Sequence, residues 1–203
     1  MLPVRAALLE EWLCVFAHSH FSVYKEVLDI EKLSLYTVNK KYVRDLHNVD
    51  DRVLSVSPQI NKDTRVFIGI IVMFNDYKYL VPLSHPKDKH RKMRTSVDFE
   101  KIYYKDKLIA VLNYNLMIPV VDSQIKKFDF NKSQYDSIET IRYKELCKNE
   151  LVWCRKNSEI IINKANVLYN LYLSEQEFKA RSRCLNFPKL EKVCDKYKRK
   201  NDS

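Results

Sequence analysis

The chain has 203 residues, of which 46% are hydrophobic and 12% aromatic, enough for one folded domain with a buried core. It contains a single glycine, where average usage would supply about fourteen. Phosphate loops, dinucleotide fingerprints and the nucleophile elbow all need several glycines and are therefore excluded. The net charge of +10 indicates a polyanionic partner, either a nucleic acid or an anionic membrane surface.

Neither a membrane span nor a secretory signal is indicated. No apolar run approaches the ~20 residues that cross a bilayer, and Glu10 and Glu11 interrupt the apolar start of the chain. The five cysteines form no CxxC pair and their number is odd, which is typical of reduced thiols and not of a zinc site or disulfide framework. We therefore expect a cytoplasmic protein without a metal or other cofactor.

Residues 1–31 differ in composition from the rest. They carry two basic and five acidic side chains, so the positive excess lies in residues 32–203. The helical run Ala6–Phe16 is compatible with a docking helix. Alternatively, the coding start is misassigned, because Lys25-Glu26-Val27 is what a ribosome-binding site encodes in frame. In either case we expect function in a single domain at 32–203.

The β pattern begins at residue 33. An alternating run over 33–38 predicts a strand, and Asn39 can cap a short helix through Tyr42, Val43 and Leu46. A polar loop follows at 47–64.

The next segment predicts a hairpin. Residues 65–74 form a long strand that is apolar on both faces, Asn75-Asp76 is a two-residue turn, and 77–83 return as the partner strand. Gly69 inside the first strand predicts a bulge or a bend.

A second hairpin is predicted from strands at 99–104 and 108–112 around Lys105-Asp106-Lys107, and a further strand at 116–121 contains Pro119, which indicates an edge or an end.

The period becomes helical from about residue 135. One apolar stripe runs through Tyr143, Cys147, Leu151 and Cys154, and another through Ile161, Ala165, Leu168 and Tyr172. Asn157-Ser158 separates or kinks the two, and the chain after 186 is either a short basic helix or frayed. The whole predicts an α+β domain with a compact, strongly twisted antiparallel sheet packed with helices.

The segment that follows the 77–83 strand concentrates chemically useful side chains. Five of the eight residues 87–94 are Lys or Arg, and Ser84, His85 and Lys87 stand where a rigid sheet can hold them. Pro86 restrains His85 towards an extended backbone. Most charge runs are simply solvated, but a histidine flanked by a hydroxyl and a lysine is a candidate for proton transfer.

The sequence offers no cluster of acids for a metal-dependent nuclease. A metal-free ribonuclease needs less: a group that activates the ribose 2′-OH, cations that stabilise the charged transition state, and an acid for the leaving 5′ oxygen. Lysine, arginine, serine and histidine suffice for these roles.

An ordered series of short motifs resembles the ToxN/AbiQ family of endoribonuclease toxins from type III toxin–antitoxin systems, over about residues 33–197. The motifs are Leu35-Tyr-Thr-Val38, Val66-Phe-Ile-Gly-Ile70, Lys78 to Lys87, Leu116-Met-Ile-Pro119, Tyr143-Lys144, Asn157-Ser158, and Cys184, Asn186 and Phe187.

The resemblance implies a coiled, partly barrel-like sheet distantly like MazF/Kid toxins. It also implies metal-independent cleavage that leaves a 2′,3′-cyclic phosphate, neutralisation by a small structured repeat RNA in an RNA-bridged complex, and a role in phage defence by abortive infection. The family's site loop falls on Ser84-His85-Pro86-Lys87, its essential lysine on Arg65, and its tyrosine after the first strand on Tyr42. Arg65 cannot readily release a proton, so it would stabilise phosphate, and His85 could have taken over proton transfer.

The expected catalytic residues are therefore Ser84, His85, Lys87 and Arg65. The expected RNA-binding residues are Tyr42, Lys89, Arg91, Lys92, Arg94, Lys144 and Lys148. A non-catalytic RNA- or DNA-binding module, or an adaptor whose basic face meets protein, would have the same charge. The loop at 84–87 and the family resemblance favour the enzyme.

Overall fold

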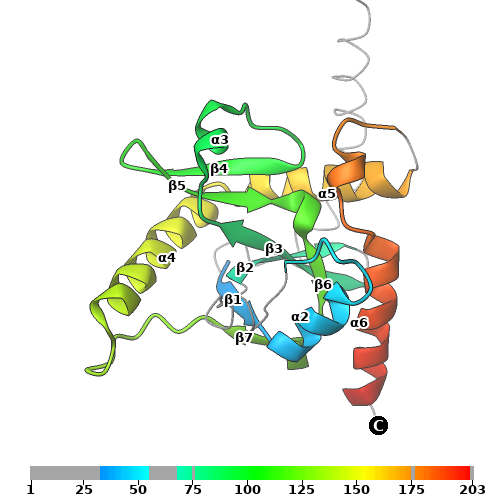
Figure 1. The fold of residues 1–203 in the computed structure, drawn as a ribbon, viewed down its shortest axis with the longest axis horizontal. Helices are drawn as coiled ribbons and strands as arrows, with labels where there is room; N and C mark the ends of the chain where they lie inside the picture. The colour runs from blue at the N-terminus through cyan, green and yellow to red at the C-terminus, as the bar shows by residue number, and fades with distance from the viewer. Residues whose placement is uncertain (1–32, 55–67, 75, 175–176, 202–203) are drawn as a thin grey trace, which may run out of the picture. The chain divides into compact units, whose positions relative to one another are not determined.

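An antiparallel sheet covered by helices forms the part of the chain that the computed structural model describes, which is residues 33–201 apart from 55–67, 75 and 175–176 (Figure 1). The N-terminal segment 1–31 lies outside these residues. The strands are β1 (Leu35–Val38), β2 (Ile68–Phe74), β3 (Tyr77–Ser84), β4 (Phe99–Tyr104), β5 (Lys107–Asn113), β6 (Ile118–Val120) and β7 (Ile125–Lys127). The helices are α2 (Lys40–His47), α3 (Asp88–Lys92), α4 (Ile138–Lys156), α5 (Ser158–Leu173) and α6 (Phe187–Asn201), with 3-10 turns at Tyr114–Leu116, Asp122–Gln124 and Arg181–Arg183.

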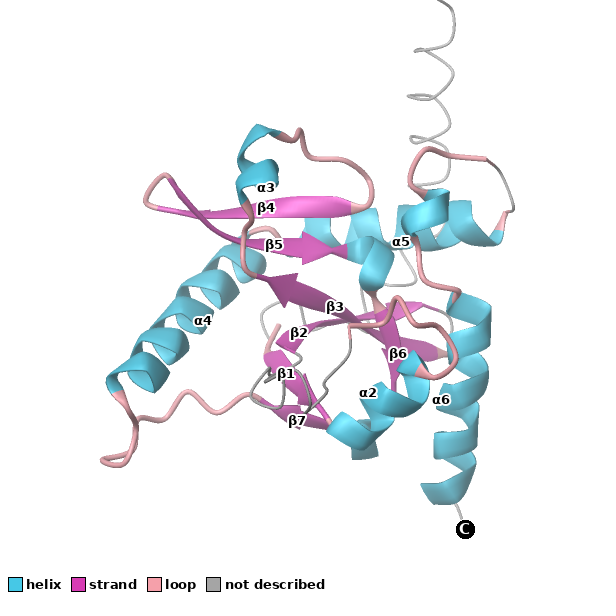
Figure 2. Ribbon diagram, viewed as in Figure 1, coloured by secondary structure: helices cyan, strands magenta, loops and turns pink. Residues whose placement is uncertain are grey.

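β3 is the central strand. The sheet order is β4-β5-β3-β2-β1-β7, and β6 pairs with β3 off this path. Along one edge β3 pairs with β2, and along the other it pairs first with β6 and then, at Leu83 and Ser84, with β5. A strand that changes partner along one edge lets the sheet curl, and Figure 2 shows the strongly curled half-barrel that results. The predicted α+β class with a twisted antiparallel sheet is confirmed.

Several predicted boundaries are confirmed by local chemistry. The Asn39 side chain accepts hydrogen bonds from the backbone N–H groups of Lys41 and Tyr42, at 2.8 and 3.4 Å, and so begins α2. Phe74 pairs with Tyr77, as the predicted two-residue hairpin turn requires. The break between α4 and α5 falls at Asn157.

Gly69 lies in a regular ladder, so of the two predicted alternatives, a bulge or a bend in a coiled sheet, the bulge is wrong. It pairs with Tyr36 of β1 and Pro82 of β3 without a register shift. A Cβ atom there would lie 2.2 Å from the carbonyl oxygen of Val81. The strand needs glycine at this position because the backbone of β3 approaches too closely for any side chain.

Two elements differ from the expected pattern. The basic loop after β3 contains the short helix α3, and β7 forms an edge strand beside β1.

In the second hairpin Lys105 and Asp106 both have positive φ, 45° and 59°, so the turn has two residues, and β5 begins at Lys107.

Helices cover the sheet on separate sides. α4 packs on β4 and β5, and α6 packs on β6 and α2, so that α4 and α6 stand apart in Figure 1. The core between the helices and the sheet contains Tyr79, Leu112, Met117, Ile118 and Phe187, all fully buried. Among the described helices, none is long and apolar enough to cross a membrane.

α6 separates its charges between two faces. Glu191 accepts hydrogen bonds from the hydroxyls of Tyr79 and Tyr169 at 2.6 and 2.7 Å, and Asp195 accepts one from Tyr77 at 3.0 Å. The outer face carries four exposed cations, which we call the α6 stripe: Lys189, Lys192, Lys196 and Arg199. The acids thus dock α6 on the sheet, while the stripe faces solvent.

Candidate active site

Ser84 is held by the sheet itself. As the last residue of β3 it pairs with Val111 of β5, and the Asn113 side-chain amide donates a hydrogen bond to its Oγ at 2.9 Å. A serine hydroxyl has one hydrogen to donate and two lone pairs. Because Asn113 occupies a lone pair, the Ser84 hydrogen remains available for a phosphate or ribose oxygen.

Lys87 is held by a reciprocal pair of hydrogen bonds with His90. Its backbone N–H donates to His90 Nδ1 at 3.0 Å, and the His90 N–H donates to the Lys87 carbonyl at 2.8 Å. The imidazole is buried and lies beside the ring of Phe99, with ring centroids 6.2 Å apart. These contacts fix the backbone just after His85-Pro86 and begin α3.

Lys101 of β4 also contacts the backbone of this loop. This buried side chain donates from Nζ to the carbonyl oxygen of Arg91 at 3.2 Å. Burial and the ammonium groups of Lys89, Lys87 and Lys101 lower the pKa of His90 below its ordinary value. The lowered pKa thus reflects the burial of the ring first and the positive charge of the loop second.

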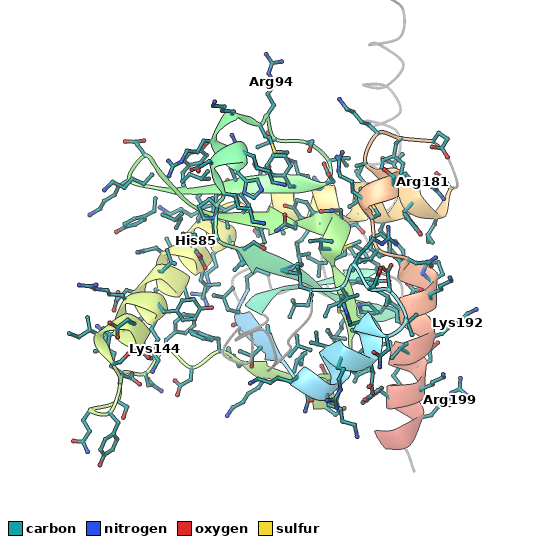
Figure 3. All side chains as sticks on the ribbon, viewed as in Figure 1. His85, Arg94, Lys144, Arg181, Lys192 and Arg199 are labelled. Carbon is teal, nitrogen blue, oxygen red and sulfur yellow. The ribbon has the colours of Figure 1, made fainter. Side chains whose placement is uncertain are left out.

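Above these anchors the loop presents an exposed set of basic side chains. They are His85, Lys87, Lys89, Arg91, Lys92 and Arg94, and Figure 3 shows Arg94 projecting away from the sheet. Within the described part of the chain their one ion pair joins Arg91 to Asp88 of the same turn, at 3.8 Å. The loop therefore offers concentrated positive charge beside a fixed hydroxyl and an imidazole.

This arrangement can bind a phosphodiester and act on it. Cations fixed beside a phosphate stabilise the additional negative charge of the transition state. An exposed imidazole can take or give a proton near neutral pH. Ser84, His85 and Lys87 lie within four consecutive residues at the end of β3, where Ser84 is half-buried and the other two side chains are exposed.

Tyr42 does not lie on this surface. It has no exposed area, its hydroxyl donates to the carbonyl oxygen of Pro119 at 2.8 Å, and its ring packs edge-on against Tyr197 at 4.8 Å. Burial raises the pKa of the Tyr42 hydroxyl. The expectation of an RNA contact is therefore wrong for this residue, which packs between α2, β6 and α6.

The two α4 cations that were expected to bind RNA, Lys144 and Lys148, have different surroundings. Lys144 binds Asp136 at 2.7 Å and the carbonyl oxygen of Asn131 at 2.5 Å, with 14% of its side chain exposed. Its charge is thus compensated, and it ties the preceding loop to α4. Lys148 is exposed and lies 3.8 Å from Glu145, so it remains available to RNA.

Arg65 lies outside the described residues. Sequence reasoning missed Asn113, His90 and Lys101. Asn113 directly follows the strand predicted at 108–112, and a polar residue just after a strand is a weak signal. His90 stands three residues after Lys87, the spacing at which a capping box places its acceptor, but Glu or Gln is the usual residue there.

Glu150 has a strongly perturbed carboxyl group. Burial in α4 raises the pKa of Glu150 to about 8. Among the described residues, no three His, Cys, Asp or Glu side chains converge as a metal site would require.

Sequence comparison identifies the family to which this fold and loop belong. A family model described as the toxin ToxN of type III toxin-antitoxin systems matches residues 34–195. The chain belongs to the ToxN family. The match includes the whole of β3 and the loop that follows it, and it begins just after the N-terminal segment.

ToxN-family relatives match over most of their length. The endoribonuclease ToxN of Pectobacterium atrosepticum is 28% identical over 163 residues, covering 78% of this chain and 90% of that protein. The endoribonuclease AbiQ of Lactococcus lactis is 26% identical over 189 residues, covering 88% and 96%.

Solved structures of such toxins share the fold. A type III toxin that is selectively inhibited by a non-coding RNA pseudoknot aligns with a TM-score of 0.68 at 23% identity, covering 82% of this chain and 98% of that one. AbiQ, a lactococcal anti-phage endoribonuclease, aligns with a TM-score of 0.67 at 21% identity, covering 83% and 99%.

Proposed function

We propose that this chain is a metal-independent endoribonuclease toxin. In the proposed reaction the ribose 2′-OH attacks the adjacent phosphate, the bond to the 5′ oxygen breaks, and a 2′,3′-cyclic phosphate remains. The observation that supports this chemistry best is the loop at the end of β3, where Ser84, His85 and Lys87 adjoin concentrated positive charge. Named ToxN and AbiQ relatives are endoribonucleases.

Each step has a candidate group. One group takes the proton of the 2′-OH and another gives a proton to the leaving 5′ oxygen, and His85 is suited to either transfer. The Lys87 ammonium neutralises charge on the non-bridging oxygens as the transition state forms. The Ser84 hydroxyl donates to the same phosphate, and Arg65 is expected to add a second cation.

The regulator that fits this site is a small structured RNA made of repeats. A pseudoknot RNA inhibits one structural neighbour, and a processed non-coding RNA regulates an antiviral system in another. We propose that such an RNA binds the basic loop here, bridges several toxin molecules and is itself processed. The setting would be phage defence in the cytoplasm, with the toxin domain at 32–203 sufficient for activity.

Incubating purified protein with RNA in EDTA tests the reaction. We expect cleavage, with cyclic phosphate and 5′-hydroxyl ends detected by mass spectrometry. Protein carrying both Ser84→Ala and Lys87→Ala, purified in parallel, controls for a contaminating ribonuclease. Intact RNA that nonetheless shifts on a gel would identify a non-catalytic binding module instead.

A further inference from the structure

His90 occupies a position in α3 where its side chain acts on the backbone of the site loop. Lys87 is the N-cap residue of α3, and His90 is the third residue of the helix. In a capping box the side chain at this third position accepts a hydrogen bond from the N-cap backbone N–H. Here His90 Nδ1 accepts that bond from Lys87 at 3.0 Å.

The hydrogen bond requires one particular form of the imidazole. Nδ1 can accept only when it carries no proton, so the neutral ring has its hydrogen on Nε2. Protonation would turn Nδ1 into a donor facing the Lys87 N–H. It would also add a positive charge beside the ammonium groups of Lys87, Lys89 and Lys101.

The charged groups that face the ring come from its own turn and from β4. The charges that act on the ring are those of Lys89 and Lys87 of the loop and Lys101 of β4, and the one acid of the same turn is Asp88. Asp88 pairs with Arg91 at 3.8 Å and is fully exposed, so it offers little compensation. The loop therefore favours neutral His90.

We propose that His90 is a positioning residue, whose neutral imidazole holds the backbone of Lys87 so that the side chains of His85 and Lys87 face the RNA phosphate. Ser84 is fixed separately by β5 and Asn113. Loss of the cap therefore releases Lys87 while Ser84 stays in place. The consequence for cleavage rests on the proposed function, whereas the bracing itself does not.

Substituting His90 by Gln and by Leu separates the hydrogen bond from the packing. Gln supplies an acceptor at every pH, as in an ordinary capping box, whereas Leu fills the space without one. At pH 7.5 we expect His90→Gln to cleave RNA within about threefold of wild type, and His90→Leu to be slower by about 5–30-fold, the size expected for one lost cap. Equal rates for Gln and Leu would overturn the proposal.

The pH profile gives a second readout. The pKa of His90 is lowered, so the brace is complete above about 6.5, the ordinary imidazole value, and is lost at lower pH as the ring protonates. Because any pH dependence that His85 contributes is common to both proteins, the ratio of the wild-type rate to the His90→Gln rate isolates His90, and this ratio should fall as the pH is lowered below about 6.5. A ratio that stays constant from pH 5 to pH 8 would contradict a role for the His90 ring.

Nuclear magnetic resonance tests the brace without any RNA. In wild type the His90 side-chain nitrogens should show the tautomer with hydrogen on Nε2, and the Lys87 amide should exchange slowly. Slow exchange should persist in His90→Gln and be lost in His90→Leu. If these signals appear but no variant cleaves RNA, the proposed function fails and the brace stands; if the Lys87 amide exchanges equally in all three proteins, the brace fails.

Discussion

The loop cations should determine how strongly RNA binding depends on salt. The change is replacement of Lys89, Arg91, Lys92 and Arg94 by Ala, which removes four exposed charges. Each phosphate contact to a single strand contributes about 0.7 to the slope of log K against log salt concentration. Because Arg91 forms an ion pair with Asp88, we expect the variant to lose three to four phosphate contacts. The slope of log K against log salt concentration should therefore fall by about 2–3.

Fluorescence anisotropy of a labelled single-stranded RNA between 50 and 500 mM salt measures this slope. Extrapolated over a tenfold change in salt, the loss corresponds to about 10²–10³ in affinity. Folding stability should change little, because exposed charges contribute about 1 kcal/mol or less.

The α6 stripe provides the matched control. Replacing Lys189, Lys192, Lys196 and Arg199 by Ala removes the same charge from a separate side of the sheet, where Figure 3 labels Lys192 and Arg199. This variant should keep most of the slope. Equal losses in both variants would mean that net charge alone attracts RNA. An unchanged slope in the loop variant would move the RNA to another face, for example beside Lys148.

Other predictions address single groups. Lys87→Ala should lower both the cleavage rate and the affinity for RNA. His85→Ala should slow single-turnover cleavage by about 10²–10⁴-fold with little loss of affinity. Near-wild-type cleavage by His85→Ser would remove His85 from the mechanism. Tyr42→Phe should lower the free energy of unfolding by about 1–2 kcal/mol, because the Pro119 carbonyl loses its buried donor, and chemical denaturation should show this without a change in RNA affinity. A chain beginning at Leu33 should fold and cleave RNA, and loss of soluble protein would contradict this.

Most of the sheet and the long helices follow from sequence periodicity. The two hairpins have β-rich runs on either side of short polar turns, and α4 and α5 each have a repeating apolar stripe. β7 could not be predicted because its three residues include Lys126 and Lys127, which give no apolar alternation. It forms because β1 offers it an edge, and this is a tertiary cause.

The residues of the candidate site that adjoin in the chain could be singled out from the sequence, whereas the contacts that depend on the fold could not. Ser84, His85 and Lys87 lie within four residues at the end of β3, whereas Asn113, which binds the Ser84 hydroxyl, comes from β5. The Asp136 contact that compensates Lys144 depends on the course of the loop before α4. The burial of Tyr42 could be predicted from spacing alone, since it shares the apolar face of α2 with Val43 and Leu46. The family resemblance instead implied that Tyr42 contacts RNA.

The central claim is attack by the ribose 2′-OH, and a single-atom change in the substrate tests it most directly. Once a cleavage position has been mapped, one 2′-deoxynucleotide is placed immediately 5′ of the scissile phosphate, and single-turnover cleavage is measured in EDTA. We expect cleavage at that phosphate to stop while affinity for the RNA stays within about twofold, because a missing hydroxyl removes no charge. Continued cleavage at the substituted position would show that another nucleophile attacks the phosphate and would contradict the proposed mechanism.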